Sequence, residues 1–156
     1  MTEARRALLE LASRDVLVVG IGNPQRGDDA AGLILGRAVA ERLGKPYLEC
    51  EEVPENYLAD MHQSPAGTVL FVDAVHMSAE AGEIRVLDLD ELADPGVSTH
   101  KSSLRLLAGL LTEHYGKRVA LLGIQPICLD WGKPLTEPVA RAIDRFVASL
   151  CGGSSE

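Results

Sequence analysis

The placement of its apolar runs constrains the fold of this chain more than any other feature of the sequence. Three runs of branched and apolar residues are almost uninterrupted, at 16–20, 68–73 and 118–124. This pattern is typical of strands that helices cover on both faces, because a strand with one wet face alternates apolar and polar residues. Two shorter runs, at 47–50 and 84–87, are expected to be further strands.

Segments with helical periodicity lie between these runs. In four of them apolar residues recur at intervals of three and four positions, as along one face of an α-helix. These segments are 4–12, 31–38, 104–111 and 139–150. Gly44 and Gly116 are expected to end the second and third helices, and a shorter helix is expected at 56–63. Strands alternating with helices predict an α/β fold, a three-layer α/β/α sandwich with a mostly parallel five-stranded sheet.

The fourth strand is expected to run antiparallel to its neighbours. Only about ten residues of turn-forming sequence separate it from the third strand, whereas a parallel crossover needs about a dozen or more. The predicted sheet therefore has one antiparallel strand.

Length and charge narrow the classes of protein. The chain has 156 residues, 46% of them hydrophobic, which suits a single domain over 1–150 followed by a disordered tail at 151–156. A net charge of -8 repels nucleic acid and anionic lipid, so no nucleic acid is expected among the partners. No signal peptide or membrane-spanning run is recognisable, so no membrane insertion is expected.

The cysteines indicate the compartment. Cys50, Cys128 and Cys151 are far apart in the sequence and form no CxxC pair. Such a set suits buried thiols in a reducing environment, so a cytoplasmic location is expected.

The turn after the first strand does not suit a nucleotide. Gly20 and Gly22 supply two glycines of a GxGxxG fingerprint, but Gln25 occupies the third position. Asp28 and Asp29 stand where the next helix begins, and two carboxylates would repel a pyrophosphate there. We expect Asp28 to cap that helix, and Asp29 is left open between supporting the helix dipole and binding a cation.

Two further polar residues belong with Asp29. Asp73 closes the third strand, at the end where ligand-binding groups collect in a parallel sheet. His100 stands in the loop before the third long helix, which the fold could bring to the same edge. Two carboxylates and an imidazole form a ligand set with an open position for a borderline ion such as zinc or nickel.

Seven motifs in order resemble the [NiFe]-hydrogenase maturation endopeptidases, and among them the type that processes the large subunit of hydrogenase 3. The match runs from 16 to 150, and the motifs within it read GIGNPQRGDDAAG, PEN, VDAVHM, GEIRVLD, STHK, LLGIQP and PLTEPV. The resemblance implies a twisted five-stranded sheet between helices. It also implies that Asp29, Asp73 and His100 are the catalytic and metal-contacting residues.

The resemblance further implies a reaction. Such an enzyme removes a short C-terminal extension from the precursor of the hydrogenase large subunit once nickel has been inserted. Nickel is then carried by the substrate, and zinc or another divalent ion could occupy the isolated site. One departure concerns the second strand, where many relatives continue with Asp-Gly-Gly and this chain reads Glu49, Cys50, Glu51. That change affects the expected choice of substrate more than the chemistry.

Other functions remain open on the sequence. Peptidyl-tRNA hydrolases also begin with a VGIGNP-like turn, but they follow it with a basic stretch instead of GDDAAG. A serine or cysteine hydrolase built on His100, an aspartic dyad of Asp29 and Asp73, and a non-catalytic nickel-binding module are further alternatives.

The remaining aromatic and polar candidates are assigned mainly to structural roles. The three other histidines are expected to be surface or local hydrogen-bonding residues: His62, His76 and His114. Trp131 and Tyr57 are expected to be packing residues, with lining of a substrate groove as the alternative. The turn containing Gln125 is expected to be structural, although its side chain could reach the site.

Overall fold

The central sheet has five strands, and the most buried of them lie in its middle. The computed structural model describes residues 2–88, 90–98 and 103–151. The strands are β1 (Val16–Ile21), β2 (Tyr47–Glu51), β3 (Thr68–Ala74), β4 (Ile84–Leu87) and β5 (Arg118–Ile124), in the order β2-β1-β3-β5-β4. Every residue of β1 and β3 is buried, as the uninterrupted apolar runs predict.

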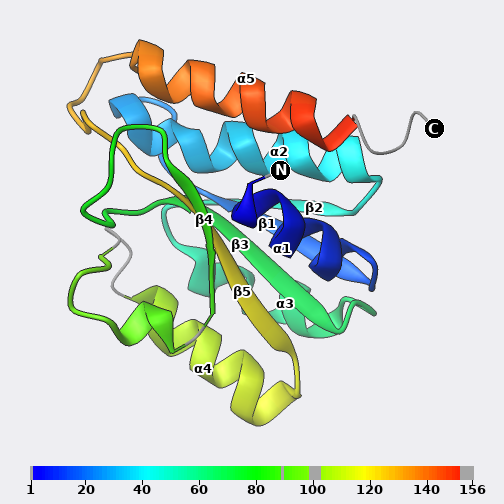
Figure 1. Ribbon diagram of the computed structural model, residues 1–156. Helices are drawn as coiled ribbons and strands as arrows, with labels where there is room; N and C mark the ends of the chain where they lie inside the picture. The colour runs from blue at the N-terminus through cyan, green and yellow to red at the C-terminus, as the bar shows by residue number, and fades with distance from the viewer. Residues whose placement is uncertain (1, 89, 99–102, 152–156) are drawn as a thin grey trace.

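The strand directions confirm the expected topology. β1 pairs in parallel with β2 and β3, and β3 pairs in parallel with β5. β4 pairs antiparallel with β5, so the short connection after β3 does make a reversal instead of a crossover. The twisted sheet with helices on both faces is the fold that the sequence predicts (Figure 1).

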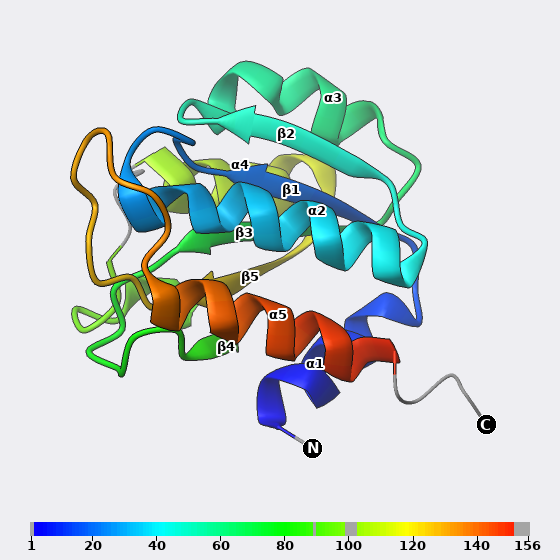
Figure 2. The same cartoon turned by 90° about the horizontal axis from the view of Figure 1, so that it is seen from above.

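Helices form the two outer layers. The α-helices are α1 (Glu3–Ala12), α2 (Ala31–Leu43), α3 (Leu58–Gln63), α4 (Ser103–Tyr115) and α5 (Glu137–Cys151), with short 3-10 turns η1 (Gly27–Ala30), η2 (Pro54–Tyr57) and η3 (Glu91–Ala93). Figure 2 shows α1, α2 and α5 on one side of the sheet and α3 and α4 on the other. The apolar core is divided accordingly into two clusters, one on each face.

The helix ends follow the expected glycines. Gly44 caps α2 with a φ of 67°, and Gly116 follows α4 with a φ of 65°, both in the left-handed region that glycine adopts at low cost. The weaker helix expected at 56–63 is η2 followed by α3.

One glycine sets how closely α2 approaches the sheet. A Cβ atom on Gly32 would lie 2.0 Å from the carbonyl oxygen of Ile21, 2.6 Å from that of Val72 and 2.9 Å from the Cα of Asp73. The first turn of α2 therefore rests directly on the ends of β1 and β3, a distance that only glycine permits.

Two further expectations concern the end of the chain and membranes. Helix α5 includes Cys151, and the rest of the expected tail, 152–156, lies outside the described residues. Among the residues that the structure describes, no helix is long and apolar enough to cross a membrane.

Candidate functional site

Buried polar side chains gather at one edge of the sheet. The parallel strands β1, β3 and β5 all end at this edge, which we call the carboxyl edge. Six polar or charged residues are buried in the described part of the chain, and all except Thr68 follow or end these strands: Asn23, Asp28, Asp29, Asp73 and Gln125. Burying a polar group costs free energy unless the group is hydrogen-bonded or paired with a charge. In open parallel sheets, ligands bind at the carboxyl ends of the strands. This edge is therefore the candidate site.

Asp29 lies in the turn η1, between β1 and α2. Its side chain is 1% exposed, and its Oδ2 accepts a hydrogen bond of 3.0 Å from the backbone N–H of Asn23. The turn wraps tightly around this residue, since a Cβ on Gly22 would lie 2.1 Å from the carbonyl oxygen of Asp29. The glycine-rich turn thus holds a carboxylate at the place where related turns hold a phosphate.

Asp73 is fully buried near the end of β3. Its Cα lies against Gly32, three residues after Asp29 in the sequence, and η1 packs against β3. The fold therefore brings to the same edge the two carboxylates that the sequence predicts for it. Their catalytic and metal-binding roles stay predictions.

His100, the third predicted ligand, lies outside the described residues. The chain leading to His100 can nevertheless be followed as far as Ser98. Ser98 forms a two-way backbone bridge with His76, with N···O distances of 2.7 and 2.9 Å. The loop that carries His100 thus starts beside the segment that follows Asp73.

Asp28 corrects one sequence prediction, because it does not cap α2. The cap residue of α2 is Ala30, which makes no side-chain cap bond. The fully buried Asp28 carboxylate instead accepts hydrogen bonds from the loop between β5 and α5: at Oδ2 from the N–H groups of Ile127 (2.9 Å) and Cys128 (3.2 Å), and at Oδ1 from that of Thr136 (2.8 Å). Asp28 therefore fixes a loop that is about a hundred residues away in the sequence.

The buried Gln125 side chain makes a second connection at this edge, which includes the exposed His76. The Gln125 Oε1 accepts hydrogen bonds from the N–H groups of Met77 (2.7 Å) and Ala79 (3.2 Å), while its Nε2 lies 3.1 Å from the His76 Nδ1. Gln125 thereby ties the end of β5 to the loop after β3. The expected local role of His76 and structural role of this turn are confirmed.

Asn23 is a site residue that the sequence prediction missed. Its Oδ1 accepts the N–H of Gln25 at 2.8 Å and its Nδ2 donates to Glu52 at 2.8 Å, while its own N–H binds Asp29. The available signal was its position after a glycine in a turn, where asparagine often bonds to the backbone two residues on. Asn23 links the Asp29 turn to the segment after β2.

A cavity of about 370 Å³ opens beside these residues. Its walls come from the turn after β1 and from the segment after β2, and they include Asn23, Glu51 and Tyr57. Glu51 has a left-handed φ of 54°, a conformation that glycine adopts more readily than glutamate. The predicted departure from Asp-Gly-Gly therefore places a carboxylate side chain on the cavity wall.

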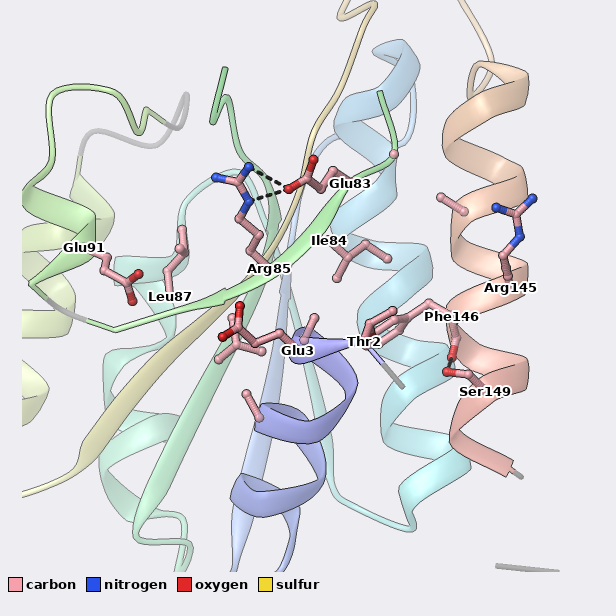
Figure 3. A pocket seen from close by; sticks show the side chains of 15 residues that line it. Thr2, Glu3, Glu83, Ile84, Arg85, Leu87, Glu91, Arg145, Phe146 and Ser149 are labelled. Carbon is pink, nitrogen blue, oxygen red and sulfur yellow. Dashed lines mark hydrogen bonds and ion pairs between the residues drawn. The ribbon is translucent and has the colours of Figure 1, made fainter. Parts of the chain in front are cut away.

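A larger cavity lies elsewhere. It has a volume of about 740 Å³ and is lined by β4, the start of α1 and one face of α5. Figure 3 shows it with the ion pair between Arg85 and Glu83, whose N···O distance is 2.6 Å. None of its lining residues is among the buried polar residues of the carboxyl edge, so its size does not make it the candidate site.

Cys50 does not suit a nucleophile. Cys50 is 1% exposed, and burial, with a smaller contribution from the carboxylates of Asp60 and Glu49, raises the pKa of its thiol to about 12. At neutral pH Cys50 is therefore protonated and unreactive. Cys128 is half-buried, and both thiols are free, as expected.

Metal binding by the described residues alone is not indicated. Within 2–88, 90–98 and 103–151 no group of three histidine, cysteine or acidic side chains is placed to hold an ion. The predicted ligand set includes His100, which falls in a gap between these ranges.

Trp131 also corrects a prediction. It does not pack in the core but is 64% exposed, whereas Tyr57 is partly buried against the core and lines the 370 Å³ cavity. The Arg26 guanidinium lies 5.4 Å from the centroid of the Trp131 ring, within the range of a cation–π contact.

The fold and the buried polar edge define an α/β protein with a candidate catalytic site at the carboxyl ends of its strands. The family model for hydrogenase maturation proteases (HycI) matches residues 47–152. The chain belongs to the hydrogenase maturation protease family, as its sequence motifs indicate, and it is therefore a hydrolase.

Relatives support this placement over nearly the whole chain. The hydrogenase 3 maturation protease of Escherichia coli (strain K12) is 33% identical over 141 residues, which cover 88% of this chain and 89% of the relative. The crystal structure of a [NiFe] hydrogenase maturation protease from Thermococcus kodakarensis KOD1 superposes with a TM-score of 0.78 at 31% identity, over 94% of this chain and 97% of the other. The solution structure of an E. coli endopeptidase gives 0.72 at 31% identity, with 92% of each chain covered.

Proposed function

We propose that this protein removes the C-terminal extension from the nickel-loaded precursor of a [NiFe]-hydrogenase large subunit. Membership of the maturation protease family gives the reaction class. The observation that carries the proposal is the pair of buried carboxylates, Asp29 and Asp73, at one edge of the sheet. A buried acidic edge in an otherwise apolar scaffold is suited to engage a cation that the substrate brings.

In this proposal Asp29, Asp73 and His100 contact the nickel ion held by the precursor. Two carboxylate oxygens and one imidazole nitrogen are donors that suit nickel or zinc at positions left open by the substrate's own ligands. The bridge between His76 and Ser98 supports the placement of His100, because the loop begins two residues before it at the same edge. A precursor without nickel brings no positive charge to this acidic edge. The enzyme would therefore bind and cleave only a precursor into which nickel has been inserted.

The direct test is cleavage of the purified precursor, with and without nickel, followed by mass spectrometry of its C-terminus. We expect a shortened product only from the nickel-loaded form. Equal cleavage of the nickel-free form would contradict recognition through the ion.

Substitutions then test the three residues. Asp29→Asn, Asp73→Asn and His100→Ala are each expected to lower kcat/KM by about a hundredfold or more, because each removes a contact to the reacting centre. Asp130→Asn and His114→Ala are matched controls on exposed residues, and thermal melting by circular dichroism reports folding. A His100→Ala variant with wild-type cleavage would remove that residue from the mechanism.

The cytoplasmic location expected from the cysteines stays a prediction and belongs to this proposal. Insertion of nickel precedes the cleavage, so the enzyme would act in the compartment where the precursor is assembled.

A further inference from the structure

Exposed apolar side chains are concentrated around the candidate site. Six large hydrophobic residues are exposed in the described part of the chain, and two of them, Leu106 and Tyr115, belong to α4. The other four stand in the first turn of α2 or in segments that follow β2 and β5 at the carboxyl edge: Ile34, Val53, Ile127 and Trp131. We call these four residues the apolar rim.

The members of the rim surround the turn after β1. Pro24 in this turn lines the 370 Å³ cavity together with Val53, and it also lines a neighbouring cavity of about 350 Å³ together with Ile34. On another side of the turn, the carbonyl oxygen of Gln25 accepts a hydrogen bond of 2.7 Å from the N–H of Gly132, directly after Trp131. The rim therefore lies next to the turn that carries Asp29.

The part of the rim after β5 is held in place in the free protein. Asp28 accepts the N–H of Ile127 at 2.9 Å, and the Arg26 Nε donates to the carbonyl oxygen of Leu129 at 3.2 Å. The same Arg26 guanidinium lies over the ring of Trp131. Ile127 and Trp131 are 60% and 64% exposed. Because these contacts already hold their segment in place, binding through the two side chains costs little conformational entropy.

We propose that the apolar rim is a docking surface for the folded body of the hydrogenase large-subunit precursor, which rests on the proposed function. A stable protein complex buries about 800 Å² on each partner, far more than two carboxylates and a peptide end can supply. Any protein that delivers a metal-bound segment to Asp29 and Asp73 must cover the adjoining rim. Tryptophan and arginine are also the residues that most often dominate such interfaces, and Trp131 and Arg26 stand together here.

The test separates docking from cleavage. The double variant Ile127→Ser with Trp131→Ala is compared with Leu106→Ala, which truncates a side chain that is 78% exposed on α4. With nickel-loaded precursor we expect the double variant to raise KM by about tenfold or more with kcat within about twofold of the wild type. Leu106→Ala is expected to change neither parameter.

Three outcomes would overturn the inference. One is a double variant that processes the precursor with the wild-type KM, and another is a loss confined to kcat. The third is a wild-type dimer in sedimentation analysis that the double variant dissociates, since the rim would then cover a second copy of the chain. The Kd of the wild-type enzyme for the precursor is measured as well. A wild-type enzyme that binds the precursor but does not cleave it would refute the proposed function and leave the docking surface standing.

Discussion

Asp28 and Asp29 are adjacent in the sequence, but their carboxylates accept hydrogen bonds from different segments of the chain. Asp29 is held by the N–H of Asn23 within its own turn. Asp28 reaches the loop between β5 and α5, where the Thr136 hydroxyl also bonds to it at 2.9 and 3.0 Å. A buried carboxylate surrounded by donors is stable because each N–H or O–H replaces a lost water. The pair therefore couples the candidate site to the loop that carries Trp131.

The role of Asp28 can be tested by Asp28→Asn. The asparagine side chain has the same shape as aspartate, but its amide NH2 group would face backbone N–H groups of the loop and could not accept their hydrogen bonds. We therefore expect the free energy of unfolding to fall by about 2–3 kcal/mol. The emission of Trp131, the single tryptophan of the chain, should also become more quenchable by iodide as its loop loosens.

The control for this experiment is Asp130→Asn, on an exposed residue of the same loop. It is expected to leave both the stability and the quenching unchanged. Unaltered quenching in Asp28→Asn would show that other contacts hold the loop.

At the scale of elements, the site depends on how α2 meets the sheet. The start of this helix touches the ends of β1 and β3 through Gly32, and η1 directly before it carries Asp29. The connection from β1 to α2, residues 22–30, therefore ends against the sheet. Its geometry positions Asp29 relative to Asp73, because both lie against the same helical turn.

The glycines of two helices provide a matched comparison for this packing. Gly32→Ala would place a Cβ 2.0 Å from a backbone oxygen, so we expect a loss of about 3 kcal/mol or more and impaired processing. Gly109→Ala in α4 meets no atom within 4 Å, and we expect a gain of about 0.5–1 kcal/mol with unchanged activity. Chemical denaturation of both variants checks these values, and a neutral Gly32→Ala would contradict the close approach.

At the scale of the whole molecule, the core around α1 lies apart from the carboxyl edge, where we propose that the substrate binds. Helix α1 packs on α5 and β4, and its residues join the core cluster on one face of the sheet. The apolar rim and the buried polar residues lie at the carboxyl edge. Substitutions in the first region should therefore alter folding without altering recognition.

Leu8→Ala tests this separation. Leu8 is 1% exposed in α1, and its truncation is expected to lower the free energy of unfolding by about 2–5 kcal/mol. At a temperature where the variant remains folded, the KM for the precursor should equal that of the wild type. A raised KM would show that α1 contributes to substrate binding.

The sequence by itself determined the parts of this protein that depend on local pattern. The uninterrupted runs of β1 and β3 predicted buried strands, the short link after β3 predicted the antiparallel β4, and the ordered motifs indicated the family. The placement of Asp29 and Asp73 at strand ends also followed, because side chains at the carboxyl ends of parallel strands share one edge.

Only the tertiary structure decided which groups these residues bind. The hydrogen bonds of the Asp28 carboxylate join positions 99 to 108 residues apart, and those that link Gln125 to His76, Met77 and Ala79 span 46 to 49. Neither helical nor strand periodicity carries information about such partners, so Asp28 was expected to be a cap. The exposure of Trp131 has the same cause, since a loop residue is buried or exposed according to which distant segment its backbone is bonded to.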